Sequence, residues 1–171
     1  MIEPVPLIDV IVEEGAWDSD AEATVRRAIT EAAIATGRDF SDRVVAVLLT
    51  DDASIRRLNA RWRHVDKPTN VLSFPSVSGP QGPVTALGDI AIAHETVARE
   101  AAAEGKPFTN HLAHLSVHGF LHLLGHDHDT DAAAKRMEAL ERAILARLGV
   151  PDPYLPHETL AREAPPQHIR G

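Results

Sequence analysis

Histidine is concentrated in one short stretch of this 171-residue chain. Six of the ten histidines lie within the eighteen residues from 111 to 128, where an even scatter would place about one. They are His111, His114, His118, His122, His126 and His128. The same stretch has the apolar periodicity of a helix. Any fold of this chain therefore has to give several neighbouring imidazoles a favourable environment.

The spacing of three of these histidines predicts a metal site. His118 and His122 are four residues apart, so a helix places both imidazoles on one face, within reach of a single ion. Gly125 can take the positive φ that ends a helix, and the returning chain then brings His128 to the same ion. Three imidazoles leave one tetrahedral position open, which is typical of catalytic metal sites.

The residue types favour zinc, with one ion per chain. The sequence contains no cysteine, which excludes thiolate metal sites, iron–sulfur clusters, thiol catalysis and disulfides. Any metal must be held by nitrogen or oxygen ligands. Zn²⁺ suits imidazole nitrogens, although nickel, copper and other first-row ions compete for the same ligands.

A zinc peptidase is one candidate for such a site. The three histidines and Gly125 have the spacing of the metzincin peptidases. Those enzymes carry the glutamate that acts as general base directly after the first histidine, and that position is Gly119 here. Hydrolysis of a peptide bond by that mechanism therefore lacks its proton acceptor.

The remaining histidines of the cluster have several possible roles. His111 and His114 extend the helical face that carries His118, so they either support the metal ligands or serve the structure. His126 either points to solvent, offers an alternative ligand or acts as an acid or base beside the metal. A single buried or exposed histidine is more often structural, and these alternatives stay open.

The rest of the chain alternates strand-like and helix-like segments. Strands are expected at 7–12, 43–50, 70–74 and 87–93, and helices at 18–37, 51–63, 94–104, 109–124 and 129–149. About four strands and about five helices, with the helices concentrated late, predict an α+β fold with a small mixed sheet. We expect one domain over residues 1–150 and an irregular, proline-rich C-terminal tail over 151–171.

Charge and hydropathy narrow the possible partners. The formal net charge of −8 argues against a protein that coats nucleic acid through bulk charge. No segment resembles a signal peptide or a membrane span, so we expect a cytoplasmic protein with no membrane partner. One short segment is basic, and it contains Arg56, Arg57, Arg61, Arg63 and Lys67. These side chains form either a solvated helix face or a contact surface for phosphates.

Several motifs together resemble one known family. The run from His118 to His128, HGFLHLLGHDH, is similar to the signature of the YbeY-type metal-dependent endoribonucleases, which are bacterial ribosomal RNA maturation factors. Further matching segments are Leu58-Asn59, Arg63, Asp66-Lys67-Pro68-Thr69-Asn70-Val71-Leu72-Ser73-Phe74-Pro75 and Leu87-Gly88-Asp89-Ile90. The matching segments extend from about Leu58 to Tyr154. One departure is His126, where that family usually has tyrosine.

The resemblance implies a zinc-dependent endoribonuclease specific for single strands. Its ligands would be His118, His122 and His128, and its roles would be maturation of the 16S rRNA 3′ end and late 70S ribosome quality control. The implied partners are single-stranded RNA, ribosomal RNA and ribosomal particles, with no DNA expected. Arg63 aligns with the functional arginine of the family, which implies a catalytic contact that stabilises charge on the phosphoryl oxygens.

Three polar residues outside the histidine cluster are weaker candidates for the site. Thr69 and Asn70 either stabilise the turn at Pro68 or line the cleft. Asp89 either orients a ligand histidine, contacts substrate or satisfies neighbouring backbone groups. His126 and Asp127 are candidates for the acid or base, and both water and the 2′-hydroxyl of RNA remain possible nucleophiles.

Two rival functions remain compatible with the sequence. A ribosome-assembly binding module could use zinc only to fix the return that carries His128 against the helix. A zinc peptidase or amidohydrolase is the other rival, and Gly119 counts against it. An open coordination position and metal-dependent turnover would distinguish a catalyst from a binding module.

Overall fold

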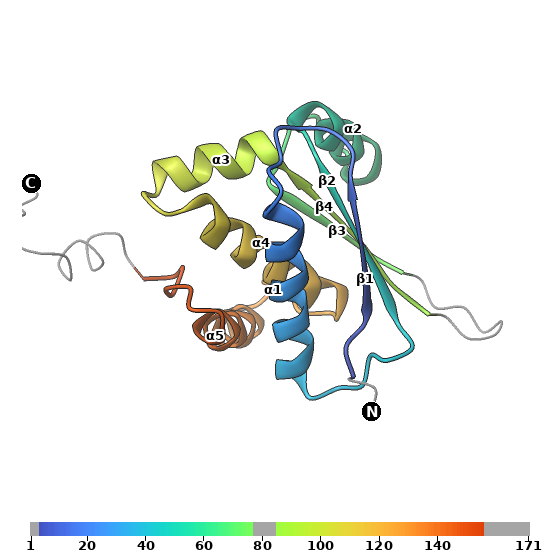
Figure 1. The fold of residues 1–171 in the computed structure, drawn as a ribbon, viewed down its shortest axis with the longest axis vertical. Coiled ribbons are helices and arrows are strands. Elements are labelled where there is room, and N and C mark those ends of the chain that lie inside the picture. Colours follow the sequence, from blue (N-terminus) through green and yellow to red (C-terminus); the bar gives the residue numbers. More distant parts are fainter. Residues whose placement is uncertain (1–3, 77–84, 156–171) are drawn as a thin grey trace, which may run out of the picture.

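The computed structural model describes residues 4–76 and 85–155, which form a four-stranded sheet and five helices (Figure 1). The strands are β1 (Leu7–Val12), β2 (Val44–Thr50), β3 (Val71–Pro75) and β4 (Ala86–Ala93). The helices are α1 (Ala21–Thr36), α2 (Asp52–Arg63), α3 (His94–Ala103), α4 (Phe108–Leu123) and α5 (Asp131–Arg147). These elements confirm the predicted α+β class.

The sheet is mixed and has the order β1-β2-β4-β3. The three strands β1, β2 and β4 are parallel, whereas β3 pairs with β4 in the antiparallel sense and forms an edge. Helices α1, α4 and α5 lie on one side of the sheet, and α2 lies on the other (Figure 1). The helix that carries the histidines is therefore enclosed between the sheet and further helices.

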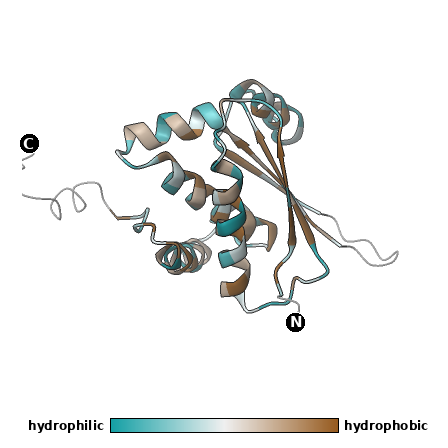
Figure 2. Cartoon of the chain, viewed as in Figure 1, coloured by the Kyte–Doolittle hydropathy of each residue, from teal (hydrophilic) through white to brown (hydrophobic). Residues whose placement is uncertain are grey.

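The main core fills the space between the sheet and α1, α4 and α5. Alternate residues of β2, Val45, Val47 and Leu49, are fully buried on this side, as period-2 alternation requires. Phe120 of α4 packs against Phe40 with ring centroids 5.7 Å apart. The strands and the inner helix faces are accordingly the apolar parts of the chain (Figure 2).

A smaller core lies under α2 on the opposite face of the sheet. Its buried members are Ile55 of α2, Leu72 of β3, and Ala91 and Ala93 of β4. The Asp51 side chain accepts a hydrogen bond from the Ser54 backbone N–H at 2.9 Å and so caps the start of α2. This second core fixes the position of α2, whose last residue is Arg63.

Helix α4 approaches β3 and β4 closely at Gly119. A Cβ atom at this position would lie 3.1 Å from both Ile90 Cγ2 and Ser73 Oγ. The Ser73 hydroxyl donates a hydrogen bond to the Gly119 carbonyl at 3.0 Å. The absence of a side chain at Gly119 thus brings the histidine helix against the β3 edge of the sheet.

Most predicted elements are observed with shifts of one or two residues at their ends. Residues 77–84, between the expected strands at 70–74 and 87–93, lie outside the described residues, as do residues 156–171 of the expected tail. Residues 151–155 are described, and among them Tyr154 contacts α5 and α4. That contact brings a residue from beyond position 150 to the functional site.

Candidate metal centre and cleft

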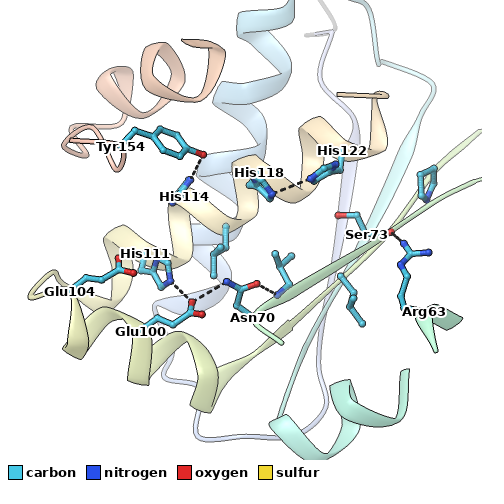
Figure 3. A pocket seen from close by; sticks show the side chains of 14 residues that line it. Arg63, Asn70, Ser73, Glu100, Glu104, His111, His114, His118, His122 and Tyr154 are labelled. Atoms are coloured by element: carbon cyan, nitrogen blue, oxygen red, sulfur yellow. Dashed lines mark hydrogen bonds and ion pairs between the residues drawn. The ribbon is translucent and has the colours of Figure 1, made fainter. Parts of the chain in front are cut away.

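Helix α4 presents four histidines along one side (Figure 3). His118 and His122 occupy successive turns, and their Nε2 atoms lie 3.0 Å apart. The pKa of His122 is lowered by burial and by the neighbouring imidazoles of His118 and His128. A lowered pKa favours the neutral imidazole, which is the form that binds a metal ion.

The chain reverses at Gly125 and returns His128 to the same place. Gly125 has φ +99°, and the His126 backbone N–H donates to the Leu121 carbonyl at 3.1 Å, which closes the end of the helix. One nitrogen from each of His118, His122 and His128 lies within 4.8 Å of the others. The structure therefore brings together the three histidines that the sequence predicted as ligands.

Glu141 of α5 supports this triad, and the sequence analysis did not identify it. Its carboxylate is fully buried and accepts a hydrogen bond from His118 Nδ1 at 2.6 Å. Since Nδ1 then carries the proton, the lone pair of His118 lies on Nε2, the atom that faces His122. A buried carboxylate thus fixes the tautomer and the orientation that a metal ligand needs.

Further donors keep the Glu141 carboxylate ionised. His114 Nε2 donates to Oε1 at 3.1 Å, and the Tyr154 hydroxyl donates to the same oxygen. Burial raises the pKa of Glu141, but the hydrogen bonds from His114, His118 and Tyr154 outweigh it and lower the pKa to about 2. Burial and the adjacent carboxylate together raise the pKa of Tyr154, so the phenol stays a donor.

The donor set fits a first-row divalent metal ion. Three convergent imidazoles with a carboxylate behind one of them form a common arrangement around zinc. His114, His118 and Glu141 form a second cluster of convergent donor atoms. Their hydrogen bonds to one another occupy those atoms, so this second cluster supports the triad and is not a separate metal site.

A cleft of about 560 Å³ extends from the triad along α4 to the edge of the sheet. His118 and His122 line one side, and Arg63, Asn70 and Ser73 line the other (Figure 3). Its other polar lining residues are Glu100 of α3, Glu104 directly after that helix, His111, His114 and Tyr154. The cleft therefore places one guanidinium group opposite the imidazoles.

Arg63 is directed to the cleft by the way in which α2 ends. His64 takes a left-handed conformation with φ +61°, which terminates the helix directly after Arg63. The Arg63 guanidinium donates to the Ser73 carbonyl at 2.5 Å and lies 4.9 Å from the centroid of the Phe74 ring. An exposed arginine is thereby held at the β3 edge, with donors left to bind an anion.

The rest of the basic segment does not line the cleft. Arg56 forms an ion pair with Asp66 at 2.8 Å, and Arg57 donates to the Ser54 hydroxyl at 3.0 Å. Arg61 lies over the Trp62 ring. Of the five cationic residues in this described segment, Arg63 alone contributes to the cleft lining.

His111 lies at the other end of the cleft, in contact with α3. Its Nε2 is 2.8 Å from Glu100 Oε1, and the same oxygen accepts a hydrogen bond from Asn70 Nδ2 at 3.0 Å. Burial lowers the pKa of His111, although Glu100 opposes that shift. Asn70 and His111 thus both meet the cleft, but they contact Glu100 and not the three predicted ligands.

The other candidates occupy different positions. His126 is half-buried in the turn after α4, and Thr69 is half-buried but does not line the cleft. Asp89 is exposed on the α2 side of β4, whereas its neighbour Ile90 faces the main core. Strand alternation separates Asp89 from the histidines, which leaves substrate contact and backbone support as its possible roles, and Glu141 is the carboxylate that contacts His118.

Within the described residues, no helix combines the length and the hydropathy that a membrane span requires.

Comparison with known proteins finds one of similar structure. The solution structure of TM1509 from Thermotoga maritima has the same fold, with a TM-score of 0.54 and 22% identity over 88% of this chain and 100% of that chain.

Two curated relatives carry the description Endoribonuclease YbeY. The protein from Bradyrhizobium sp. is 56% identical over 92% of this chain and 97% of its own length. The protein from Nitrobacter hamburgensis is 54% identical over 94% of this chain and 89% of its own length. The family model described as Endoribonuclease YbeY matches residues 9–149. The chain therefore belongs to the endoribonuclease YbeY family.

Proposed function

We propose that this protein is a zinc-dependent endoribonuclease that cleaves single-stranded RNA in maturation of the 16S rRNA 3′ end and in late 70S ribosome quality control. The proposal assigns the metal to His118, His122 and His128 and a catalytic contact to Arg63. It places the protein in the cytoplasm with ribosomal particles as partners. The proposal also treats residues 1–150 as one domain and residues 151–171 as a proline-rich tail.

The observation that carries the proposal is the placement of Arg63 across one cleft from the imidazole triad. A phosphodiester is an anion, and its cleavage develops further negative charge on the phosphoryl oxygens. The names of the curated relatives agree with this chemistry. A guanidinium group and the imidazoles of His118 and His122 line one cleft, with the His128 imidazole beside them, and these are the groups that such a substrate requires.

The side chains of this protein have separate tasks in that reaction. Bound zinc supplies a Lewis acid to the phosphodiester. The Arg63 guanidinium binds a phosphate oxygen and stabilises the charge that develops there. Glu141 holds His118 in one tautomer and one orientation, so the ligand set is organised before substrate binds.

Gly119 gives a structural reason against the peptidase alternative. A glutamate at this position would need space where its Cβ already lies 3.1 Å from Ile90 and Ser73. Close packing of α4 on the sheet therefore occupies the place where a metzincin keeps its general base. The ribosome-assembly binding module remains the alternative that activity measurements have to separate from an enzyme.

Metal content and RNA cleavage test the proposal together. We expect about one zinc per chain by elemental analysis and metal-dependent cleavage of a defined single-stranded RNA. His122→Ala should lose both, whereas Arg27→Ala changes an exposed side chain of α1 that does not line the cleft and should lose neither. A matched duplex distinguishes single-strand specificity, since a duplex holds its phosphates in a fixed helical path.

Retention of zinc without RNA cleavage would favour the binding module. Cleavage that survives His122→Ala at the wild-type rate would point to a contaminating nuclease and would contradict the metal assignment. Equal cleavage of the single strand and the duplex would contradict the proposed specificity alone.

A further inference from the structure

A second, mainly apolar groove lies on the face of the sheet that is opposite the histidine cleft. It has a volume of about 490 Å³ and lies between the sheet and α2. Ala46, Leu48 and Ala91 contribute from the central strands, and Trp62 of α2 and Phe74 of β3 contribute aromatic rings. Its size is that of an ordinary small-ligand pocket.

Trp62 has no evident role in the folded core. It is 55% exposed. The other tryptophan, Trp17, is half-buried, packs against His94 and Phe108, and donates from its indole N–H to the Thr50 carbonyl at 3.1 Å. Because a large exposed ring beside an apolar groove is unfavourable in water, Trp62 marks a contact surface.

Both aromatic rings of the groove are paired with cations. The Arg61 guanidinium lies 5.0 Å from the Trp62 ring centroid, and that of Arg63 lies 4.9 Å from the Phe74 centroid. The whole chain has a net charge of −8, so positive charge beside these rings is a local feature. Aromatic faces with adjacent guanidinium groups suit a ligand that combines a flat ring with a phosphate.

The groove and the cleft meet at one edge of the sheet. Ser73 of β3 lines the cleft, and the next residue, Phe74, lines the groove, because successive side chains of a strand point to opposite faces. Arg63 contacts both residues. Since β3 is an edge strand, a flexible polymer that occupies the cleft can pass over this edge into the groove.

Asp89 shows which part of such a polymer the groove accepts. It pairs with Phe74 across the strands, and its exposed carboxylate belongs to the groove lining. A carboxylate repels a phosphate but accepts hydrogen bonds from an exocyclic amino group. The groove therefore suits the base, while Arg61 and Arg63 at its aromatic side suit the phosphates on either side of it.

We propose that this groove is a nucleobase subsite for an unpaired nucleotide that flanks the cleaved phosphodiester, with Trp62 as the stacking platform. The inference rests on the proposed endoribonuclease function and adds a structural cause for its specificity. A base that is stacked within a duplex cannot enter the groove while its phosphate occupies the cleft. Unpaired RNA can present both groups at once.

The test pairs a change in Trp62 with a change in the RNA. A set of single-stranded RNAs shares one sequence, and each member has one abasic nucleotide at a different position near the cleavage site. Cleavage of every RNA is measured for the wild-type enzyme, Trp62→Ala and Trp62→Phe. Leu7→Ala serves as the matched control, because Leu7 is exposed but does not line the groove. Thermal unfolding and zinc content are measured for every variant.

We expect Trp62→Ala to lower kcat/KM about tenfold on the intact RNA, mainly through KM, since stacking on one aromatic residue contributes a factor of that order. Trp62→Phe should retain most of the activity, and Leu7→Ala should retain all of it. At one flanking position, removal of the base should lower wild-type kcat/KM to the same extent and should abolish the difference between wild type and Trp62→Ala.

Three results would overturn the inference while leaving the enzyme established. The first is unchanged cleavage by Trp62→Ala, and the second is an equal loss at every abasic position. The third is a change in oligomeric state on Trp62→Ala with cleavage intact, which would assign the groove to a second copy of the chain. Absence of cleavage by the wild-type enzyme would instead contradict the proposed function.

Discussion

The carboxylate of Glu141 lies 2.6 Å from Nδ1 of His118, although the two residues belong to different helices. The pair connects α5 to the predicted metal ligand on α4. It gives the Glu141 side chain a role in metal binding that can be measured without any substrate.

We expect Glu141→Gln to weaken zinc binding by about 10- to 100-fold, as loss of a carboxylate behind a ligand histidine commonly does. The amide is isosteric but uncharged, so it stabilises the ligand set less. Competition with a chelator of known affinity measures the effect. Glu138→Gln, one turn earlier and in contact with the side chain of Arg142, should bind zinc like the wild type. Equal affinities for all three proteins would contradict the role of Glu141.

The phenol of Tyr154 should contribute to stability through the same carboxylate. Tyr154→Phe removes a donor to the buried Glu141 and keeps the ring against His114. We expect a loss of about 1–3 kcal/mol in the free energy of unfolding, because a buried charged acceptor loses a hydrogen bond. Urea unfolding at fixed zinc concentration measures this loss, and a change below about 0.5 kcal/mol would indicate that solvent replaces the phenol.

Arg63 should matter for catalysis far more than for stability. We expect Arg63→Ala to lower kcat by about 10²–10³ and to change the free energy of unfolding by less than about 1 kcal/mol, because the side chain is exposed. Arg57→Ala is the matched control, since Arg57 lies on the same helix but outside the cleft lining. Parallel losses of activity and thermal midpoint would assign Arg63 to the structure.

His111 should make stability depend on pH. Burial lowers its folded-state pKa below the ordinary value of 6.5, so the unfolded chain binds the proton more readily. The contribution of the neutral ring is therefore complete above pH 6.5 and is lost as the pH falls below that value. In chelator-treated protein, the stability difference between wild type and His111→Gln should shrink from pH 7.5 to pH 5.5. A constant difference would show that the ring does not titrate differently on folding.

Gly119 should resist the substitution that would restore the metzincin pattern. Gly119→Glu places a side chain and a charge where Ile90 and Ser73 already touch the helix. We expect a destabilisation of at least about 3 kcal/mol and no peptidase activity. Ala102→Glu, at an exposed position of α3, should have little effect. Thermal unfolding of both variants measures the contrast, and a stable Gly119→Glu protein would mean that the α4 packing relaxes easily.

Local patterns were sufficient to predict the fold class and the triad. The spacing of His118 and His122 is a property of one helix. Gly125 indicates where that helix ends and the chain reverses, which brings back His128. The strands and helices follow from hydrophobic periodicity and capping residues such as Asp51 and Gly37. These signals act over a few residues, so a single sequence carries them.

The support for the triad comes from contacts between distant segments, which such patterns do not contain. Glu141 is separated from His118 by 23 positions. One signal was present, because Glu141 falls within the buried stripe of Met137, Ile144 and Leu145, where a charge needs a partner. The alternatives for Asp89 stayed open for a similar reason, since the pattern of β4 does not say which face of the sheet receives the histidine helix.

The separation of the ligands from their support also sets an order of assembly during synthesis. A growing chain contains all three imidazoles once residue 128 has been added, but it lacks the carboxylate until 141 and the phenol until 154. Because chains are made and begin to fold from the N-terminus, an unfinished chain carries ligands that nothing yet orients. A nuclease built in this way acquires an organised metal centre only after the chain has been extended past residue 154.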